Sequence, residues 1–187
     1  MISQLLLSPL LTAEQCRGRV SEADFLTAES FCDSRAAEYL TWRAVLANYL
    51  GNVPQIVYTE QGAPRLEGCD LYIGVSHTVD LVAVVVSDEA CAVDVERKDR
   101  DVKRISERFL SASEREMCCS NEDFVTFWCA RECYYKLRGD SSLSLLTDMR
   151  ITAYDQEAGC VTVEDNRAQS ATFRIERTAE HIVVYTI

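Results

Sequence analysis

Residues 71–96, LYIGVSHTVDLVAVVVSDEACAVDVE, contain three candidate strands in succession, at residues 71–77, 81–86 and 90–96. Each candidate strand is rich in apolar residues, and only a short polar connection separates it from the next. No connection is long enough for a helix, which disfavours a fold in which strands and helices alternate strictly. The stretch therefore predicts an α+β fold.

Helices are predicted on both sides of this stretch. Residues 34–50 carry apolar side chains at helical spacing, and a glycine follows them. Helical spacing resumes at Val102, and Ser111 and Glu114 have the spacing of a capping box, which predicts the start of a new helix. A longer helix is expected over residues 122–138, again with a glycine at its end.

The C-terminal part returns to strand-like alternation. Four segments there read as a strand meander, at residues 150–154, 160–164, 172–177 and 181–187. Residues 61–64 form a predicted turn, and residues 1–30 show no clear pattern.

The composition is that of an acidic globular protein. The chain has 187 residues, with 19 Lys and Arg against 30 Asp and Glu, and a net charge of −11. One compact body or two small halves can bury a core at this length. The acidic excess disfavours general binding to nucleic acid or to a membrane surface, because both carry negative charge. The longest apolar run, residues 81–86, is too short to span a bilayer, and residues 1–11 lack the basic start of a signal peptide, so we expect a soluble, cytoplasmic protein.

The nine cysteines do not indicate a disulfide framework. Their number is odd, and no Cys-x-x-Cys pair occurs. We interpret them as reduced thiols that serve as small core residues. With only two histidines, a structural zinc site is not expected.

One segment, residues 97–108, is clearly basic. It holds six basic residues against three acidic ones, the basic ones being Arg97, Lys98, Arg100, Lys103, Arg104 and Arg108. Such a run is either a solvated helical face or a docking surface for an acidic partner, to which Phe109 and Leu110 would add apolar contact.

Two carboxylates share a face of the third candidate strand. Alternation along the strand places Asp94 and Glu96 on one side and Val93 and Val95 on the other. Like charges so close raise each other's pKa, and a divalent cation resolves this conflict, with hard oxygen ligands favouring magnesium. The alternative is a strand at the sheet edge whose carboxylates both lie in water.

The long C-terminal helix carries the second group of candidate residues. Trp128, Glu132 and Lys136 are four residues apart and share a face, with Arg131 and Tyr135 beside them. A surface ion pair and an aromatic core stripe would explain these residues without any function. However, a carboxylate beside buried aromatic surface needs a partner or a role.

A weaker candidate follows Gly74 at the end of the first strand. Ser76, His77 and Thr78 offer several hydrogen-bond donors beside a glycine, which would suit a phosphate. The alternative is an ordinary hydrogen-bonded histidine at a strand end.

Together, these motifs resemble those of the 4′-phosphopantetheinyl transferases, in the two-half form of the surfactin-synthetase activators. The ordered matches are Gly74-Val-Ser-His77, Ala92-Val-Asp-Val-Glu96-Arg, Arg108-Phe-Leu-Ser111-x-x-Glu114 and Trp128-x-x-Arg-Glu132-x-x-x-Lys136. Each motif is weak by itself, but four in order at plausible spacing are specific. They span about residues 62–140.

The resemblance implies an α+β pseudo-dimer. It implies two similar halves, residues 1–90 and residues 91–187, each with a small antiparallel sheet packed against a long helix. The first half would contact the nucleotide of coenzyme A, and the second would carry the metal and catalytic motifs. The active site would lie in the cleft between the halves, and the chain would be a monomer.

The resemblance also implies an activity of the holo-[acyl-carrier-protein] synthase type. Such enzymes move the phosphopantetheine arm of coenzyme A to a serine of an acidic carrier protein in fatty-acid, polyketide or non-ribosomal peptide synthesis, and release 3′,5′-ADP. Asp94, Glu96 and Glu132 would bind Mg²⁺, which holds the pyrophosphate and neutralises its charge. Glu132 would also be the base for the carrier serine, and Lys136 would stabilise the leaving group.

Further residues would contact coenzyme A according to the same resemblance. Ser76 and His77 would bind its phosphates, with His77 at the 3′-phosphate, and Arg35 and Arg43 would bind the nucleotide. Arg131 occupies the position of a family lysine, where an arginine can hold a phosphate but cannot deliver a proton.

Two other functions are compatible with these residues. A magnesium-dependent phosphoesterase or nuclease could use the same carboxylates, although the net charge disfavours a nucleic acid substrate. A non-catalytic protein that binds coenzyme A is the other alternative, because the family lysine is also missing from the turn Gly62-Ala-Pro64.

Overall fold

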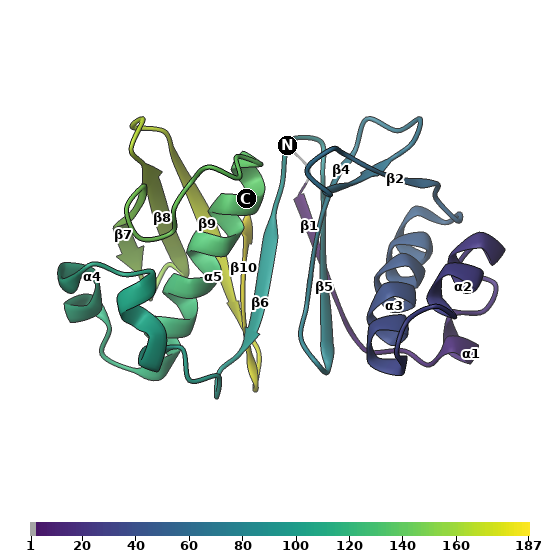
Figure 1. Ribbon diagram of the computed structural model, residues 1–187, viewed down its shortest axis with the longest axis horizontal. Coiled ribbons are helices and arrows are strands. Elements are labelled where there is room, and N and C mark those ends of the chain that lie inside the picture. The colour runs from purple at the N-terminus through teal and green to yellow at the C-terminus, as the bar shows by residue number, and fades with distance from the viewer. Residues whose placement is uncertain (1–2) are drawn as a thin grey trace. The chain divides into compact units, whose positions relative to one another are not determined.

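The structure is a computed structural model, and it describes residues 3–187 (Figure 1). The chain divides into two compact units, the first ending at Ala90 and the second running from Cys91 to Ile187. Each unit contains an antiparallel sheet and one helix of 18 residues. The predicted α+β fold is confirmed.

The first unit is built on a three-stranded sheet of order β1-β5-β4, with a separate β2–β3 hairpin. Its elements are β1 (Ser3–Pro9), α1 (Ala13–Cys16), α2 (Glu22–Ala28), α3 (Asp33–Leu50), β2 (Ile56–Tyr58), β3 (Pro64–Leu66), β4 (Tyr72–His77) and β5 (Leu81–Ser87). All neighbouring strands are antiparallel.

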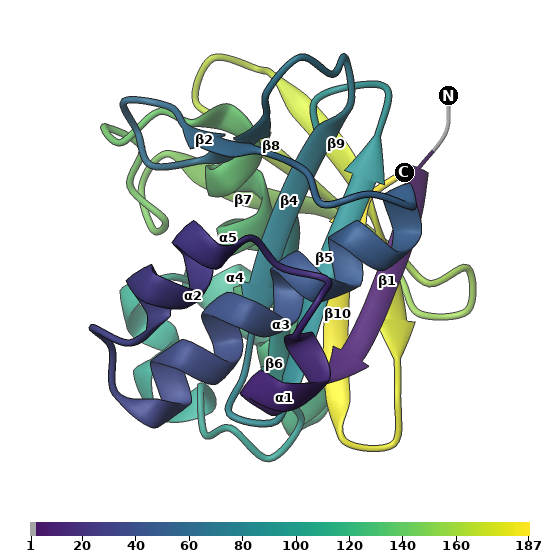
Figure 2. The ribbon, with the colours of Figure 1, turned by 90° about the vertical axis from the view of Figure 1, so that its right-hand side faces the viewer.

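The helix α3 positions the rest of the first unit. Trp42 and Leu46 of α3 pack with Val82 and Val84 of β5 in a buried cluster. Figures 1 and 2 show α1, α2 and α3 on the same face of this sheet. The helix ends at Gly51, whose φ of 74° is the left-handed conformation that glycine adopts without strain.

The second unit is built on a five-stranded antiparallel sheet of order β6-β10-β9-β8-β7. Its elements are β6 (Val93–Arg97), a 3₁₀ helix η1 (Lys103–Arg108), α4 (Ala112–Met117), α5 (Asn121–Arg138), β7 (Met149–Asp155), β8 (Cys160–Asp165), β9 (Ser170–Arg177) and β10 (His181–Thr186). The strand β6 is at the edge of the sheet and pairs with the last strand, β10. In Figure 1, α5 lies along one face of this sheet.

The helix α5 supplies much of the core of the second unit. Phe127, Cys129, Cys133 and Tyr134 are fully buried in the same cluster as residues of the sheet. Burial raises the pKa of the Cys129 and Cys133 thiols well above the usual value, so these thiols stay neutral. All nine cysteines are free thiols. Their interpretation as small core residues holds for Cys16, Cys129 and Cys133, which are buried. It is wrong for Cys32, Cys69 and Cys119, which are exposed.

Two local predictions for the second unit need correction. The segment after Val102 is a short 3₁₀ helix instead of an α-helix, with hydrogen bonds three residues apart from Ile105 N to Val102 O and from Phe109 N to Ser106 O. Phe109 and Leu110 are 1% and 2% exposed. They belong to the core and cannot give apolar contact to a partner, as the sequence had suggested.

Among residues 3–187, no helix combines the length and the apolar character needed to cross a membrane.

Candidate functional site

Lys136 of α5 is bound to the buried carboxylate of Asp94 on β6. Lys136 Nζ donates to Asp94 Oδ1 at 2.7 Å and to the carbonyl oxygen of Val93 at 3.1 Å. The Asp94 side chain is 7% exposed. Burial by itself lowers the pKa of Lys136, but the charge and hydrogen bond of Asp94 outweigh it and raise this pKa overall. The helix therefore presents a charged ammonium group to the strand.

Glu96, two residues further along β6, contacts the same helix about two turns earlier, at Trp128. Trp128 Nε1 donates to Glu96 Oε1 at 3.2 Å. Arg100 forms an ion pair with the same carboxylate, and its Cζ lies 5.1 Å from the centroid of the Trp128 ring. Glu96 therefore lies between an indole and a guanidinium.

Glu132 lies between Trp128 and Lys136 on α5 and is influenced by the same groups. Burial raises the pKa of Glu132, and the charge of Asp94 raises it further, against smaller opposing effects of Lys136 and Arg100. The carboxylates of Asp94 and Glu132 are thus close enough to repel each other. The spacing predicted that Trp128, Glu132 and Lys136 share one face of the helix. In the structure, Trp128 and Lys136 of this face contact β6.

These three carboxylates match magnesium in their chemistry but are not gathered around one point. Asp94, Glu96 and Glu132 offer the hard oxygen donors that Mg²⁺ prefers. Within residues 3–187, however, no group of three His, Cys, Asp or Glu side chains is arranged to hold a metal ion. Asp94 and Glu96 are instead engaged by Lys136 and Arg100. The chemistry of these donors fits magnesium, and a bound ion would compete with Lys136 and Arg100 for the carboxylate oxygens.

Arg131 faces away from this group and is fully buried. Its guanidinium pairs with Glu114 and donates to the carbonyl oxygen of Met149 at 2.8 Å. Glu114 also accepts from the backbone nitrogen of Ile151 at 2.7 Å. The prediction that Arg131 contacts coenzyme A does not fit this position, because the guanidinium is fully buried and is engaged by Glu114 and Met149. Arg131 joins α5 to α4 and β7.

In the first unit, Arg35 and His77 lie together. Arg35 Nη1 is 3.2 Å from His77 Nε2, and Glu38 Oε2 is 3.3 Å from Arg35 Nη1 and 3.5 Å from His77 Nδ1. The arginine comes from α3 and the histidine from the end of β4. The Arg35 side chain is 53% exposed, whereas Ser76, the neighbour of His77, is buried. Two of the residues predicted to contact coenzyme A thus meet on one surface.

Arg43, the other predicted nucleotide contact, is buried and fully engaged. Its guanidinium donates to Asp24 at 2.9 Å, to Tyr58 Oη at 2.7 Å and to the carbonyl oxygen of Tyr39 at 3.1 Å. Its Cζ also lies 4.1 Å from the centroid of the Trp42 ring. The prediction of a nucleotide contact does not fit this position, because Arg43 ties α2 and the β2–β3 hairpin to α3.

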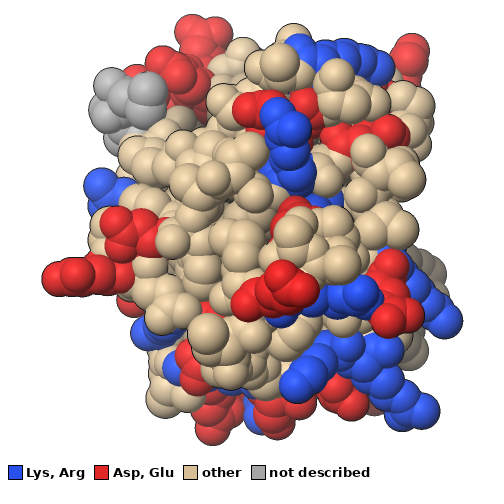
Figure 3. Space-filling view, turned by 90° about the vertical axis from the view of Figure 1, so that its left-hand side faces the viewer, with Lys and Arg blue, Asp and Glu red and all other residues tan. Residues whose placement is uncertain are grey.

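The basic segment divides into paired and unpaired residues. Arg97 pairs with Asp99 and Glu180, Lys98 pairs with Glu122, and Arg100 pairs with Glu96. In contrast, Lys103, Arg104 and Arg108 of η1 are exposed and have no ion-pair partner within the described part of the chain. Lys103 Nζ lies 5.6 Å from the centroid of the Phe124 ring. Figure 3 shows the side of the molecule that is on the left in Figure 1, and there Lys and Arg side chains gather at the lower right, with acidic side chains among them.

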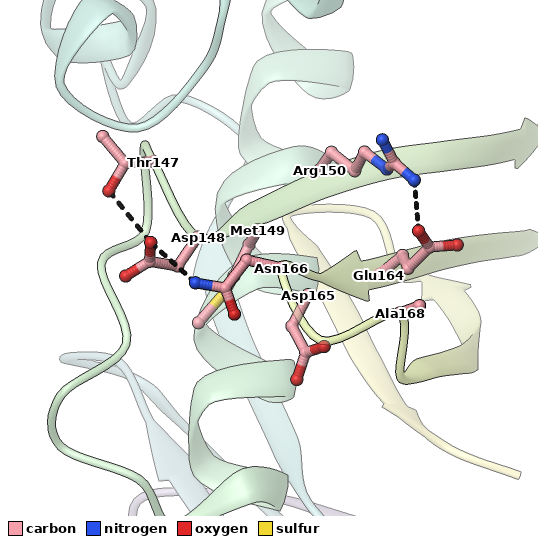
Figure 4. A pocket seen from close by; sticks show the side chains of 8 residues that line it. All are labelled: Thr147, Asp148, Met149, Arg150, Glu164, Asp165, Asn166 and Ala168. Atoms are coloured by element: carbon pink, nitrogen blue, oxygen red, sulfur yellow. Dashed lines mark hydrogen bonds and ion pairs between the residues drawn. The ribbon is translucent and has the colours of Figure 1, made fainter.

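A hollow of about 260 Å³ lies elsewhere in the second unit and contains none of the predicted site residues. Its walls include Asp148, Asn166, Arg150 and Glu164 (Figure 4). Asn166 donates to Asp148 at 3.0 Å, and Arg150 pairs with Glu164. The first contact joins the loop before β7 to the β8–β9 turn, and the second links the paired strands β7 and β8, which indicates a structural role.

Sequence reasoning missed three residues of these sites. Glu38 could have been found from its spacing of three residues from Arg35 on one helix. Arg100 lies four residues after Glu96, but no sequence pattern in the turn after β6 predicts that the Arg100 side chain points back to Glu96. Glu114 was predicted only as a capping residue, and this role is confirmed by its bonds to Ser111. No local pattern predicts its second role as the partner of Arg131.

Comparison with known proteins places these residues within a family. A family model described as the 4′-phosphopantetheinyl transferase superfamily matches residues 90–186, which include β6 and α5. The chain is 29% identical over 134 residues to the 4′-phosphopantetheinyl transferase AcpT of Salmonella typhimurium, covering 66% of this chain and 70% of the relative. It is 29% identical over 123 residues to the AcpT of Escherichia coli, covering 60% and 63%. Because the family model spans more than half of the sequence, the chain belongs to the 4′-phosphopantetheinyl transferase superfamily.

Proposed function

We propose that this protein transfers the 4′-phosphopantetheine group of coenzyme A to a serine of an apo carrier protein, releasing 3′,5′-ADP in a magnesium-dependent reaction. The observation that carries the proposal is the meeting of Asp94 and Glu96 with Lys136 and Trp128 across β6 and α5. Glu132 lies between the two helix residues, and the whole group falls within the part that matches the family.

Asp94, Glu96 and Glu132 would hold the magnesium ion. When bound, the ion neutralises the pyrophosphate of coenzyme A and makes the phosphorus easier to attack. The repulsion between Asp94 and Glu132, which raises the pKa of Glu132, supports the assignment, because a dication relieves it.

Glu132 would accept the proton of the carrier serine. The raised pKa of this carboxylate makes it a stronger base than an exposed glutamate, which favours general-base catalysis. Lys136 would stabilise the charge that develops on the leaving phosphate, since its pKa is raised and its ammonium stays charged. For this role Lys136 shares its three donor hydrogens among Asp94, Val93 and the phosphate.

Residues 1–90 would supply the contacts to the nucleotide of coenzyme A. The proposed contacts are Arg35 and His77, with His77 at the 3′-phosphate and Ser76 beside it. The distance of 3.2 Å between Arg35 Nη1 and His77 Nε2 supports a joint role, because it places a guanidinium, which suits a phosphate, beside the imidazole on one surface. Arg43 and Arg131 are left out of this set, since both are buried and engaged.

The carrier protein would dock on η1 through charge. Carrier proteins of this reaction class are acidic. Arg104 and Arg108 are exposed, have no ion-pair partner among residues 3–187, and offer cations to such a protein within a chain of net charge −11. Arg100 is left out of the docking surface, because it pairs with Glu96. We also expect the protein to act as a monomer in the cytoplasm, as a holo-[acyl-carrier-protein] synthase type of enzyme.

The test is to incubate the full chain with coenzyme A, Mg²⁺ and an apo carrier protein, and to measure the mass of the carrier. The proposal expects a phosphopantetheine mass gain that disappears in Glu132→Gln. The matched control is Glu122→Gln, which changes a half-buried glutamate of the same helix that pairs with Lys98. This control should keep the mass gain.

Other outcomes would identify the alternatives. Binding of coenzyme A without any mass gain would indicate a non-catalytic homologue. Release of phosphate or cleavage of a phosphodiester without transfer would indicate a magnesium-dependent phosphoesterase. Either outcome would reject the proposed transferase.

A further inference from the structure

The turn that follows β6 directs Arg100 back towards the strand. The backbone nitrogen of Arg100 donates to the carbonyl oxygen of Arg97 at 3.1 Å. Asn121, at the start of α5, donates from its side chain to the carbonyl oxygens of Lys98 at 2.7 Å and of Arg100 at 3.1 Å. The backbone of the turn is therefore held by the helix, and this leaves the Arg100 side chain to reach the face of α5 that carries Trp128.

Arg100 and Trp128 engage the same oxygen of Glu96. Both the indole nitrogen and the guanidinium contact Glu96 Oε1. The guanidinium also lies near the indole ring, 5.1 Å from its centroid. Glu96 is thus held in a small cage, in which an oxygen that could ligate a metal is already used.

The charges of the three carboxylates and their two cations indicate that a side-chain cation takes the place of a metal ion. Asp94, Glu96 and Glu132 together carry three negative charges when ionised, and Lys136 and Arg100 supply two positive ones. A dication added to this set would leave an excess of positive charge. A dication that takes the place of Arg100 would leave the group neutral, which is the favourable state for partly buried charges.

Arg100 is the cation that can leave at the lower cost. Its side chain is 41% exposed and comes from a turn, so that its guanidinium can return to water. Lys136 also bonds to Val93, and its departure would leave the Asp94 carboxylate, which is 7% exposed, without the cation that pairs with it. A metal ion therefore competes with Arg100 and not with Lys136.

We propose that Arg100 is a displaceable internal cation, which holds Glu96 in the metal-free protein and is released when a divalent cation binds the three carboxylates. The inference rests on the proposed function, because the magnesium site is part of it. Arg100 acts as a positioning residue: it limits repulsion among the carboxylates before metal binds and lowers their affinity for metal.

The test measures metal binding by the full chain without substrate. Mn²⁺ is titrated into the protein, free Mn²⁺ is read by electron paramagnetic resonance, and Mg²⁺ is then used as a competitor. Arg100→Gln is expected to bind Mn²⁺ about three- to tenfold more tightly than the wild type, because a competing charge has gone. Arg100→Lys keeps the charge and should stay close to the wild type.

The matched control is Arg150→Gln. Arg150 also pairs with a glutamate, Glu164, on the surface of the same unit, so the variant loses the same charge away from the carboxylates. Its Mn²⁺ affinity should equal that of the wild type. A tightening of equal size in Arg100→Gln and Arg150→Gln would reveal a general charge effect and overturn the proposal.

A second readout follows the cage itself. The chain has only two tryptophans, and Trp128 contacts both Arg100 and Glu96. Mn²⁺ or Mg²⁺ should change the tryptophan fluorescence of the wild type, and Trp128→Phe should remove that change but not the binding of metal.

The outcomes separate this inference from the proposed function. If the wild type and Arg100→Gln bind Mn²⁺ equally, Arg100 is not a competing cation, although the magnesium site and the transferase proposal stand. If neither protein binds Mn²⁺, with or without coenzyme A, both the proposed magnesium site and this inference are rejected.

Discussion

Lys136 Nζ lies 2.7 Å from Asp94 Oδ1, and this contact joins α5 to the edge strand β6 across 42 residues of sequence. The carboxylate is buried, whereas about a third of the lysine side chain is exposed. A contact of this kind both stabilises the fold and fixes two of the residues to which we assign catalytic roles.

The first prediction concerns the stability that this pair supplies. Lys136→Met removes the ammonium and leaves the Asp94 carboxylate buried, so the free energy of unfolding should fall by about 2 kcal/mol, less than for a fully buried pair. Urea denaturation followed by circular dichroism measures it. Addition of Asp94→Asn should recover part of the loss, because the stranded charge is then gone. Equal stability of Lys136→Met and the wild type would contradict the prediction.

Glu132→Gln should stabilise the fold while it abolishes transfer. Burial and the charge of Asp94 raise the pKa of Glu132, so that the ionised carboxylate is unfavourable in the folded protein. The neutral amide avoids this cost, and we expect a gain of about 1 kcal/mol at neutral pH without metal. Thermal unfolding measures it. Mg²⁺ should then raise the melting temperature of the wild type more than that of the variant.

The different positions of Arg131 and Lys136 show which parts of the site the sequence can predict. Helical spacing alone places Trp128, Glu132 and Lys136 on one face, and the structure brings Trp128 and Lys136 of this set to β6. The same spacing leaves Arg131 at the border of that face. Its burial depends on Glu114, 17 residues earlier, and on the backbone of β7. Tertiary contacts of this kind leave no local periodic signal.

Similar limits apply in the first unit. The alternating strand signal of β4 and the glycine-ended pattern of α3 predict both elements within one or two residues. β1, in contrast, contains three consecutive leucines and no alternation, and it becomes a strand by pairing with β5. Arg43 occupies the same helix as Arg35, but Asp24, Tyr39 and Tyr58 enclose it. The packing of α2 and β2 against α3 decides which of the two arginines is exposed, and the sequence does not reveal this packing.

The third prediction tests the structural role of Arg131. Arg131→Met leaves the buried Glu114 carboxylate without its guanidinium, and the free energy of unfolding should fall by about 3 kcal/mol or more. Arg131→Lys should lose less, because an ammonium can still pair with the carboxylate although it lacks the planar fork.

The control for this prediction is the affinity for coenzyme A. Calorimetry of folded Arg131→Lys should give the affinity of the wild type, whereas Arg35→Ala should bind coenzyme A more weakly. A stable Arg131→Lys variant with a large loss of affinity would restore Arg131 as a contact to coenzyme A.

The fourth prediction concerns pH and the start of α5. Asp123 is buried and accepts from the backbone nitrogens of Cys119 and Ser120, from Tyr154 Oη at 2.7 Å and from Gln156 Nε2 at 2.7 Å. Burial alone would raise the pKa of Asp123, but these hydrogen bonds outweigh it and lower the pKa below 3.8.

Since the pKa of Asp123 is lower in the folded than in the unfolded protein, its stabilisation is complete above the unfolded value of 3.8 and is lost as the pH falls through the folded value. Asp123→Asn should therefore be about 2 kcal/mol less stable than the wild type at pH 7. The difference should shrink as the pH falls below about 4, since the wild-type carboxyl then becomes neutral as well. Urea denaturation of both proteins between pH 3 and pH 7 measures it, and a pH-independent difference would contradict it.

The last prediction concerns recognition of the carrier protein. Arg104 and Arg108 of η1 are exposed and have no ion-pair partner in residues 3–187, so their charges are available to an acidic partner. Reversal of both, Arg104→Glu with Arg108→Glu, should raise the KM for the carrier roughly tenfold and reduce its dependence on salt, because steering between exposed charges is screened. The kcat should stay unchanged, since neither arginine contacts Asp94, Glu96 or Glu132.

The matched control for docking is Arg150→Glu, a charge reversal on the surface of the same unit. Arg150 is 68% exposed and pairs with Glu164. If Arg150→Glu raises the KM as much as a single reversal at Arg104 or Arg108, the carrier responds to net charge alone and η1 is not a docking surface. An unchanged KM in Arg150→Glu, together with a raised KM in the η1 variants, assigns the contact to a local surface, as an enzyme with a net charge of −11 requires for an acidic partner.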